Sequence, residues 1–441
     1  MNQFNVALWG DEAFSAILSQ KSIPEILKII ARDTSPPLYN ISEHLAFRFW
    51  GTDEVIIRGL SFAYYLIAVF FVYKIAAFFW DKRTGVLAAL LSFFNPFFFI
   101  YAFEGRMYSL LAAGTIASMY FFARLVFVKK VNRLDWYGYI LATLVALYSH
   151  HFAVFALFVQ GLWFLYFWAT GRKKPCKLLL KAFFLIGLGY LPWVIPLYNQ
   201  TQMVGGGFWL GTPTFRDLLS LTGDYLGKGN KHIFAVPALV LTLTLFVFRR
   251  WGKNQKQSLF LISWFLLPIL TTWIISQVFQ AVFFNRYLIY TIPAAMILIA
   301  SNRTKFSSAI LILTLGFYGV ICSYYFLHPI KDPFDQLAIK VREEKRGDDF
   351  VILGDAGSHQ LWESKYYGIP APIYVPKNEE LPFFVGTALM TETDIIHELP
   401  TKVRRIGVIT KGQVKAELLP TYTKAEESVF GNLYFTWFTK R

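Results

Sequence analysis

The sequence is poor in charged side chains and in cysteine. Only 16% of its 441 residues are Asp, Glu, Lys or Arg, whereas a soluble globular domain carries about 25%. Hydrophobic residues make up 55% of the chain and aromatic residues 19%. The two cysteines, Cys176 in a basic segment and Cys322 in an apolar run, do not suggest a structural disulfide. A single large soluble core and a disulfide-rich secreted scaffold are therefore both disfavoured.

Acidic residues are scarcer than basic ones, 28 against 43, which gives a formal net charge of +15. The C-terminal part from His328 onward is nearly neutral, with 15 basic and 16 acidic residues. The excess of positive charge therefore lies in residues 1–327, between apolar segments. Basic loops there set the orientation of membrane helices, so the charge does not indicate a nucleic-acid-binding protein.

Long apolar runs such as Ile56–Phe79 reach the roughly 18–20 residues that cross a bilayer. We expect ten membrane-spanning helices, at about residues 56–80, 84–101, 106–128, 134–149, 151–169, 178–198, 232–248, 258–279, 285–301 and 306–327.

Basic residues favour one side of these ten spans by about three to one. The richer side holds Lys82, Arg83, Arg124, Lys129, Lys130, Arg133, Arg172, Lys173, Lys174, Lys177, Arg249, Arg250, Lys253, Lys256, Arg303 and Lys305, and the poorer side Arg106, Arg216, Lys228, Lys231 and Arg286. Because positive loops stay in the cytoplasm, we expect a multi-pass plasma-membrane protein whose N-terminal segment and C-terminal tail are extracytoplasmic.

The pattern predicts a polytopic α-helical membrane protein in three parts. Residues 1–55 form an extracytoplasmic loop with interfacial helices at 23–30 and 39–50. Residues 56–327 form the membrane domain, and residues 328–441 a small extracytoplasmic α/β domain. Its expected strands are 350–353, 405–409 and 433–438, and its expected helical segments are 341–346 and 358–367.

An even number of spans with both termini outside leaves nothing to carry residues 1–55 across the membrane. Either the first span inserts with its N-terminus outside, or an initial span is missing from the chain. We favour the missing span.

Two adjacent carboxylates, Asp11 and Glu12, lie at the predicted aqueous edge of the membrane. A glycosyl transfer needs a base that takes the proton of the acceptor as it attacks the anomeric carbon. If the donor is a sugar phosphate, cations or a metal ion stabilise the leaving group. The same pair also suits the start of a helix, with Asp11 as cap and Glu12 in the first turn.

Further candidates lie at the extracytoplasmic ends of the spans. Glu104 is a candidate second acid or metal ligand, and Arg106 a candidate phosphate ligand. His150 suits phosphate or metal, and Arg286 suits a lipid phosphate. The alternatives are an interfacial Glu–Arg pair, a histidine without a role and an arginine that only anchors the helix.

The candidate catalytic residues are Asp11 and Glu104, and the candidate substrate-binding residues are Glu12, Arg58, Arg106, Tyr108, His150, Arg286 and Tyr287. Tyr108 and Tyr287 lie beside the arginines, and Arg58 lies unusually deep in the first span, where Asp53, Glu54 or a lipid headgroup would pair with it. The long 199–231 loop suits a lid, or is simply disordered.

These segments, read together, resemble the GT-C superfamily of polyprenyl-phosphate-sugar-dependent glycosyltransferases, and most of all the protein O-mannosyltransferase and aminoarabinose-transferase group. The resemblance covers about residues 8–327. Its motifs are Trp9-Gly10-Asp11-Glu12-Ala13-Phe14, Asp33-Thr34-Ser35-Pro36-Pro37-Leu38-Tyr39, Phe49–Ser61, Glu104-Gly105-Arg106-Met107-Tyr108-Ser109, Ser149-His150-His151 and Asn285-Arg286-Tyr287-Leu288.

The resemblance implies that Asp11 is the catalytic base and that the donor is a sugar on undecaprenyl, decaprenyl or dolichyl phosphate, bound from the bilayer. Arg106, Arg286 and His150 would then lie on the phosphate side. Family members usually begin with a span before the Asp-Glu loop, and this chain departs from them there.

We therefore expect an inverting glycosyltransferase that acts on a protein, lipid or glycan acceptor outside the cell, with a divalent cation (ligands Asp11, Glu104 and His150) as a conceivable cofactor. The alternatives are a transporter or flippase for lipid-linked saccharides and an inactive scaffold. A transporter carries ionisable residues in the middle of its spans and often repeat symmetry. Here the ionisable residues cluster at one end, which favours surface chemistry.

Overall fold

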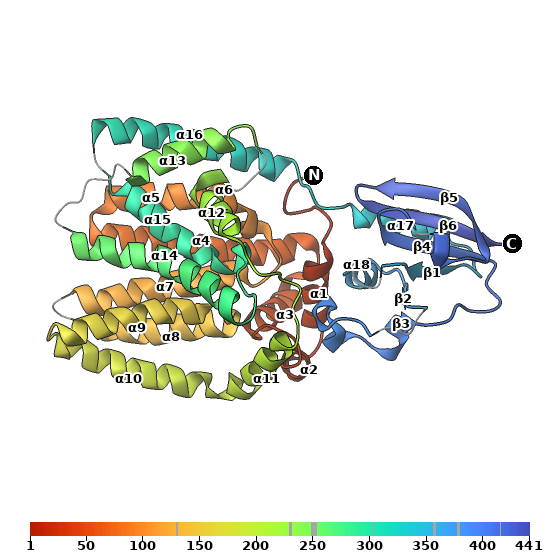
Figure 1. Cartoon of the computed structure of the whole chain (residues 1–441), viewed down its shortest axis with the longest axis horizontal. Coiled ribbons are helices and arrows are strands. Elements are labelled where there is room, and N and C mark those ends of the chain that lie inside the picture. Colours follow the sequence, from red (N-terminus) through yellow and green to blue (C-terminus); the bar gives the residue numbers. More distant parts are fainter. Residues whose placement is uncertain are drawn as a thin grey trace. The chain divides into compact units, whose positions relative to one another are not determined.

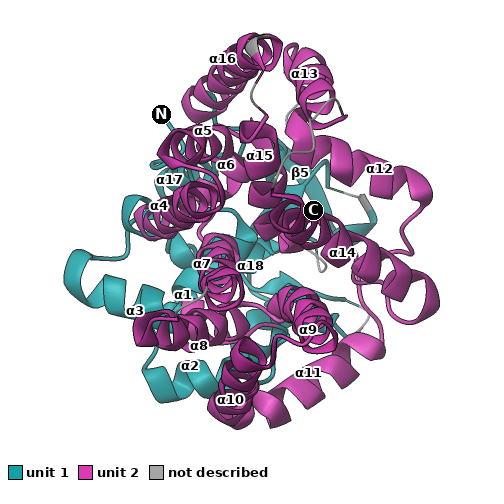
Figure 2. Cartoon of the chain, turned by 90° about the vertical axis from the view of Figure 1, so that its left-hand side faces the viewer, with its two compact units in different colours: residues 1–34, 40–57, 328–441 teal, residues 35–39, 58–327 magenta. Residues whose placement is uncertain are grey.

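The computed structural model describes residues 1–128, 131–228, 232–247, 254–302, 304–355, 359–376, 380–414 and 416–441. The chain divides into two compact units, coloured teal and magenta in Figure 2. Unit 1 comprises residues 1–34, 40–57 and 328–441, and unit 2 comprises residues 35–39 and 58–327. The N-terminal segment that carries Asp11 thus folds with the C-terminal part of the chain. The predicted three-part division into domains stays a prediction.

Three helices form the N-terminal part of unit 1: α1 (Gly10–Ser19), α2 (Ile23–Ile30) and most of α3 (Leu38–Trp50). The two helices predicted at 23–30 and 39–50 are confirmed. Ser22 is the N-cap residue of α2. The Glu25 carboxylate accepts a hydrogen bond from the Ser22 backbone N–H at 3.0 Å, which stabilises the start of the helix. Buried polar contacts join α1 to α3, with Asn40 donating to Ser15 Oγ at 2.9 Å and Ser19 donating to Glu43 at 2.6 Å.

The rest of unit 1 is a six-stranded sheet with the strand order β3-β2-β1-β4-β6-β5 (Figure 1). The strands are β1 (Phe350–Leu353), β2 (Ile373–Tyr374), β3 (Ile395–Ile396), β4 (Arg405–Lys411), β5 (Tyr422–Phe430) and β6 (Leu433–Lys440). Strand β1 pairs in parallel with β2 and β4, whereas β6 runs antiparallel to β4 and β5. The helices are α17 (Phe334–Glu344) and α18 (Gln360–Tyr366).

The sheet confirms the predicted strands at 350–353, 405–409 and 433–438. Their apolar residues form a core that includes Ile352, Ile406, Val408 and Phe438. The helix predicted at 358–367 corresponds to α18, and the one at 341–346 is the end of α17. Strands β2, β3 and β5 were not predicted: β2 and β3 have two residues each, and the nine residues of β5 include the charged Lys424, Glu426 and Glu427 without a continuous apolar run.

Unit 2 is helical, and each of the ten predicted spans contains helix. Its elements are α4 (Glu54–Phe79), α5 (Lys82–Phe93), α6 (Pro96–Ile100), η1 (Tyr101–Phe103), α7 (Tyr108–Phe127), α8 (Arg133–Ser149), α9 (Ala153–Ala169), α10 (Lys173–Tyr190), η2 (Leu191–Trp193), α11 (Val194–Gly205), α12 (Phe215–Gly223), η3 (Asp224–Lys228), α13 (Ala235–Val247), α14 (Gln255–Val278), η4 (Asn285–Thr291), α15 (Ile292–Ala300) and α16 (Lys305–Leu327).

Among the described residues, five helices are long and apolar enough to cross a membrane, or six if the bent pair α5 and α6 counts as one span. Shorter apolar helices include α9, α13 and η4 with α15. The chain thus has the helices of a multi-pass membrane protein, and the total of ten spans stays a prediction.

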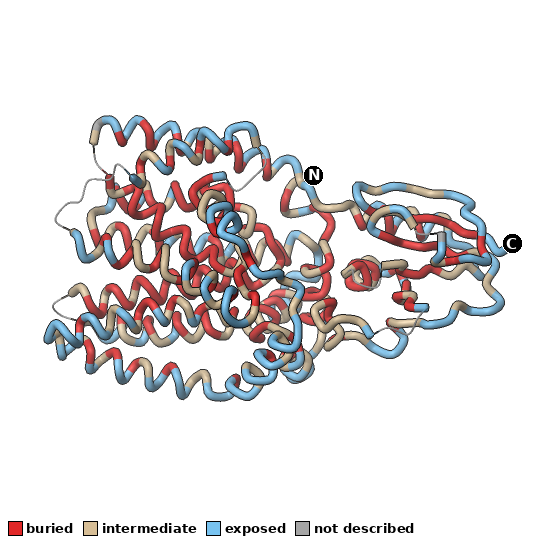
Figure 3. Tube along the Cα trace, viewed as in Figure 1, coloured by how far each residue is buried: buried red, intermediate tan, exposed pale blue. Residues whose placement is uncertain are grey.

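Helices α7 and α15 form the interior of unit 2, and their traces are almost entirely buried (Figure 3). Close packing of α7 on α8 depends on Gly114, because a Cβ there would lie 2.8 Å from the Ala146 backbone nitrogen. Ser118 and Thr143 join the same two helices by a 2.8 Å hydrogen bond. Outer helices such as α10 expose large apolar residues, Phe184 and Leu188 among them, as expected of a surface that faces lipid.

The span predicted as one helix at 84–101 is broken instead. Helix α5 ends at Phe93 and α6 starts at Pro96, with a bend of 61° between them. The cause is Pro96, which lacks a backbone N–H and disfavours helical geometry in the residue before it. Asn95 stabilises the break, since its side chain accepts from Phe98 N at 3.0 Å and donates to the Tyr225 carbonyl at 2.9 Å.

The 199–231 segment is not an irregular loop as predicted, because α11, α12 and η3 occupy most of it. Both cysteines are free, as expected. Lys129, Lys130, Lys231, Arg249, Arg250, Lys253, Arg303 and Ser358, which the sequence analysis used, lie outside the described residues.

Candidate active site

The acidic pair of unit 1 lies in the first turn of α1. Trp9, not Asp11, is the N-cap residue, with an extended backbone. Glu12 reaches back and accepts a hydrogen bond from the Trp9 backbone N–H at 3.3 Å. The helix N-terminus favours both negative charges. The alternative interpretation from the sequence is thus correct for the helix start but wrong for Asp11 as the cap.

Glu12 is fully buried and forms an ion pair with Lys331, whose Nζ lies 2.8 Å from Oε1. Lys331 belongs to the segment before α17 and is itself largely buried. A carboxylate removed from water is tolerated only when a cation or hydrogen bonds compensate it. Glu12 therefore has a structural role, which fastens the first turn of α1 to the C-terminal part of unit 1.

Asp11 is the more accessible of the two acids, with 12% of its side chain exposed. The Nδ1 atom of His359 lies 3.5 Å from its Oδ1. The backbones also approach closely, because a Cβ added to Gly10 would lie 2.0 Å from the His359 Cβ. Only glycine fits at position 10 without a shift of the neighbouring chain.

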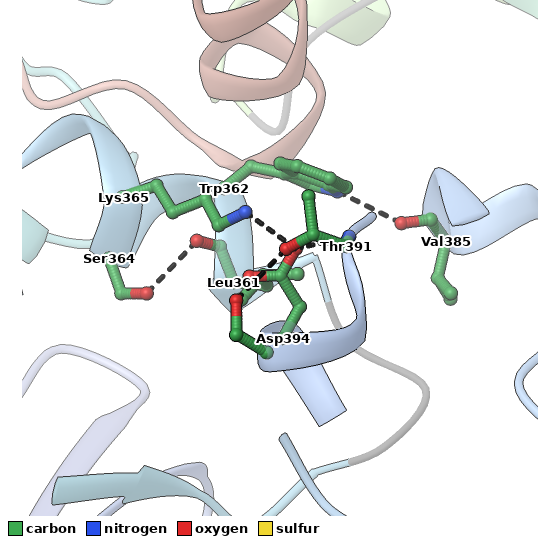
Figure 4. A network of polar contacts seen from close by, with 8 residues as sticks. Leu361, Trp362, Ser364, Lys365, Val385, Thr391 and Asp394 are labelled. Carbon is green, nitrogen blue, oxygen red and sulfur yellow. Dashed lines mark hydrogen bonds and ion pairs between the residues drawn. The ribbon is translucent and has the colours of Figure 1, made fainter. Parts of the chain in front are cut away.

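Helix α18 holds α1 in this position. The Trp362 ring meets Phe14 edge-on at a centroid distance of 5.2 Å, and its indole N–H donates to the Val385 carbonyl at 2.9 Å. Figure 4 shows the polar network that anchors α18, in which the Asp394 carboxylate accepts from Lys365 at 2.6 Å and from the Thr391 backbone at 2.7 Å.

Tyr367, just after α18, adds a second link to the N-terminal segment. Its hydroxyl accepts from the Leu8 backbone N–H at 2.8 Å and donates to Glu54 at 2.8 Å. The residues immediately before the acidic pair are thus fixed by the C-terminal part of unit 1.

A third acid, Glu363 on α18, is buried near the pair. Burial raises the pKa of its carboxyl to about 8. The nearby acids Asp332, Glu12 and Asp11 also raise this pKa, whereas Lys411 lowers it. Glu363 is therefore protonated at neutral pH and does not add a negative charge to the cluster.

In unit 2, aromatic rings surround the guanidinium of Arg286. Its Cζ lies 5.0 Å from the ring centroid of Phe284, 5.4 Å from that of Tyr108 and 5.9 Å from that of Tyr287. Such contacts favour a cation over aromatic faces. They hold the planar guanidinium in place while its N–H groups point in fixed directions.

The rings come from three elements that meet here. Tyr287, at the start of η4, lies 4.7 Å from the His150 ring and 4.9 Å from the Phe152 ring in the α8–α9 turn, and 6.3 Å from Tyr108 at the start of α7. Tyr290 ties η4 to the turn by donating to the Phe152 carbonyl at 3.0 Å.

His150 is buried and close to both arginines. Burial lowers the pKa of its imidazole well below the usual value, and His151, Arg106 and Arg286 act in the same direction. His150 is therefore neutral at physiological pH, so it suits hydrogen bonding rather than charge neutralisation. Tyr101 interacts electrostatically with both Glu104 and Arg286, so Glu104 also lies near this group of residues.

Gln200 in α11 joins two of the sequence motifs. The Nε2 atom of His151 lies 2.7 Å from Oε1 of Gln200. The Nε2 atom of Gln200 donates a hydrogen bond to the Ser35 carbonyl at 3.3 Å. The turn that carries His150 is thus linked to the Ser35-Pro36-Pro37 turn within unit 2.

Arg58 in α4 is fully buried. The pairing expected for Arg58 from the sequence, with Asp53, Glu54 or a lipid headgroup, stays a prediction.

The structure thus brings the predicted site residues together in two groups. Asp11 and Glu12 share the first turn of α1 in unit 1. Glu104, Arg106, Tyr108, His150, Arg286 and Tyr287 gather in unit 2. Among the residues that the structure describes, no three His, Cys, Asp or Glu side chains converge as metal ligands. The divalent cation stays a prediction.

Known proteins share this architecture. The family model described as dolichyl-phosphate-mannose-protein mannosyltransferase matches residues 34–197. The structure of ArnT from Cupriavidus metallidurans in the apo state matches with a TM-score of 0.68 at 12% identity, over 98% of this chain and 94% of ArnT. The chain thus shares the fold of ArnT.

Further structures agree with this assignment. ArnT bound to undecaprenyl phosphate matches with a TM-score of 0.65 at 12% identity, over 99% of this chain and 95% of ArnT. A third similar structure is the oligosaccharyltransferase AglB from Archaeoglobus fulgidus in complex with an inhibitory peptide and a dolichol-phosphate. It matches with a TM-score of 0.53 at 12% identity, over 92% of this chain and 66% of AglB. No curated protein sequence matches the chain. The resemblance to GT-C glycosyltransferases predicted from the motifs is confirmed.

Four polar residues with close contacts were not predictable from local sequence: Lys331, His359 and Glu363 in unit 1 and Gln200 in unit 2. Their partners lie far away in the chain, and no local motif marks them. A lysine just before an α/β domain, or a lone histidine before a short helix, has no spacing that points to a distant acid.

Glu363 makes the stability of unit 1 depend on pH. Its folded-state pKa of about 8 exceeds 4.5, the ordinary pKa of a glutamate carboxyl, so the folded chain binds a proton that the unfolded chain releases. This stabilisation is complete below about pH 4.5 and is lost as the pH rises through about 8. We expect the unfolding temperature of the wild type in detergent to fall between pH 5 and 8 more steeply than that of Glu363→Gln, which stays neutral.

The exposed Glu398 offers a matched control, and Glu398→Gln should keep the wild-type pH dependence. Parallel curves for the wild type and Glu363→Gln would contradict the assignment of a protonated Glu363.

Proposed function

We propose that this chain is an inverting glycosyltransferase that moves a sugar from a polyprenyl-phosphate donor to an extracytoplasmic acceptor. The proposal rests on the different environments of the two acids in the pair. Glu12 is buried in an ion pair, whereas Asp11 is partly accessible at a helix N-terminus. A GT-C fold that matches nearly the whole of ArnT supports it, because that protein was solved with undecaprenyl phosphate.

In this mechanism the hydroxyl or amine of the acceptor attacks the anomeric carbon from the face opposite the phosphate. The new bond to the sugar forms as the sugar–phosphate bond breaks, and polyprenyl phosphate leaves. Asp11 accepts the proton of the acceptor. The leaving phosphate needs no proton, since cations stabilise its charge.

Arg286 and Arg106 are the proposed partners of the phosphate. An aromatic setting keeps the guanidinium of Arg286 oriented, and such a planar fork matches phosphate oxygens bidentately. Tyr108, Tyr287 and neutral His150 would line the same site, with Glu104 and buried Arg58 completing the binding set. A divalent cation remains a separate proposal, and no step of this mechanism depends on it.

The base is tested by Asp11→Asn, which removes the proton acceptor and keeps the shape. In proteoliposomes that contain a defined polyprenyl-phosphate sugar and an acceptor, we expect transfer to fall by about a hundredfold to ten-thousandfold, with an unchanged unfolding temperature. Product formation and release of polyprenyl phosphate are both measured. Asp348→Asn, at an exposed position of unit 1, is the control and should be fully active. Lipid-linked saccharide that crosses the membrane intact, independently of Asp11, would favour a flippase instead.

The phosphate site is tested by Arg286→Lys, which keeps the charge but loses the planar fork. We expect the KM for the donor to rise about tenfold, equivalent to roughly 1.4 kcal/mol of lost binding, with a smaller change in kcat. Arg216→Lys, at an exposed position of unit 2, should leave both constants unchanged. If lysine at position 286 supports wild-type kinetics, Arg286 only anchors its helix.

A further inference from the structure

The imidazole of His359, from the C-terminal part of unit 1, lies beside the proposed base. Its Nδ1 lies 3.5 Å from Oδ1 of Asp11. That nitrogen is buried, although 30% of the side chain is exposed. The ring thus turns its Nδ1 edge inward, toward the carboxylate.

The position of His359 is fixed by its backbone rather than by a flexible side chain. A Cβ on Gly10 would lie 3.0 Å from the His359 carbonyl oxygen and 3.1 Å from its Cα, in addition to the 2.0 Å contact with its Cβ. The main chain at 359 is therefore pressed against the residue that precedes Asp11. A histidine attached here has little freedom to move away from the carboxylate.

Helix α18 continues this contact along α1. Trp362 packs on Phe14 one turn after His359, and Gly386, in a left-handed conformation with φ of 89°, allows the chain to pass over both rings. Tyr367 holds the Leu8 backbone. Contacts at 359, 362 and 367 thus bind the start of α1 from one side, which makes α18 a rigid support for Asp11.

The two acids of the first turn differ in the group that lies beside them. Lys331 forms an ion pair with Glu12, whereas the imidazole of His359 lies 3.5 Å from Asp11.

We propose that His359 is a positioning residue, which orients the carboxylate of Asp11 by donating from Nδ1–H to Oδ1. This rests on the proposed function of Asp11 as the base. A bond to Oδ1 sets the plane of the carboxylate and therefore the direction in which its other oxygen meets the acceptor proton. Catalytic hydrogen bonds are often long without substrate and tighten in the productive complex. A misplacement of about 1 Å can cost roughly a hundredfold in rate.

The test compares His359→Asn with His359→Leu. The amide nitrogen of asparagine occupies nearly the position of Nδ1 and donates a hydrogen bond without being able to titrate, whereas leucine fills the space and donates nothing. We expect Asn to retain kcat within about threefold of the wild type. Leu should lower kcat by about tenfold to a hundredfold at an unchanged KM for the donor.

His397→Leu is the matched control, because it removes another Nδ1 contact of unit 1, with the Val375 carbonyl at 2.9 Å. It should affect the unfolding temperature without changing kcat. If His359→Leu does not fold, His359→Gln replaces it, since its longer amide reaches the position of Nε2 instead of Nδ1 and should behave as the defective variant.

Two results would overturn the proposal: wild-type kcat in His359→Leu, or an Asn variant as defective as Leu, which would indicate that His359 acts by carrying a proton. Failure of the proposed function looks different. In that case the wild type itself shows no Asp11-dependent transfer, whereas an active, Asp11-dependent enzyme that tolerates leucine at 359 defeats only the positioning role.

Discussion

The buried ion pair between Glu12 and Lys331 is the interaction on which the rest of unit 1 depends. A fully buried carboxylate without a cation would lose several kcal/mol of solvation, so α1 can start where it does only if Lys331 lies beside it. The pair links the N-terminal segment to the C-terminal part of unit 1, because Lys331 lies just before α17. It also leaves Asp11 as the acid that remains partly accessible for chemistry.

The two units carry different kinds of candidate site residues. Unit 1 is rich in carboxylates near α1, whereas unit 2 gathers arginines and aromatic rings around η4, the start of α7 and the α8–α9 turn. The 3-10 turn η4 places Arg286 and Tyr287 before the start of α15 instead of within that helix. The proposed base and the proposed phosphate ligands thus belong to separately folded parts of the chain, each preorganised by its own packing.

Features with local causes were predictable from the sequence. Helix α2 was placed at 23–30 because Pro24 and apolar spacing lie within it, and β1, β4 and β6 were found because their apolar runs are continuous. The break at Pro96 was missed, since the length of the apolar run outweighed one proline. Of the candidate site, Asp11, Arg286 and His150 were selected through motif order, and their roles stay predictions. Lys331, His359 and Gln200 were not, because their roles come only from contacts with residues far away in the chain.

A double-mutant cycle on Glu12 and Lys331 tests the central claim most directly. The unfolding free energy is measured for the wild type, Glu12→Gln, Lys331→Met and the double variant. We predict that Lys331→Met alone is the most destabilised, because it leaves a buried unpaired carboxylate, and that the double variant recovers part of this loss, with a coupling of about 1–3 kcal/mol. Effects of the two substitutions that simply add would contradict the account, because the acidic motif would then not depend on the C-terminal part of the chain.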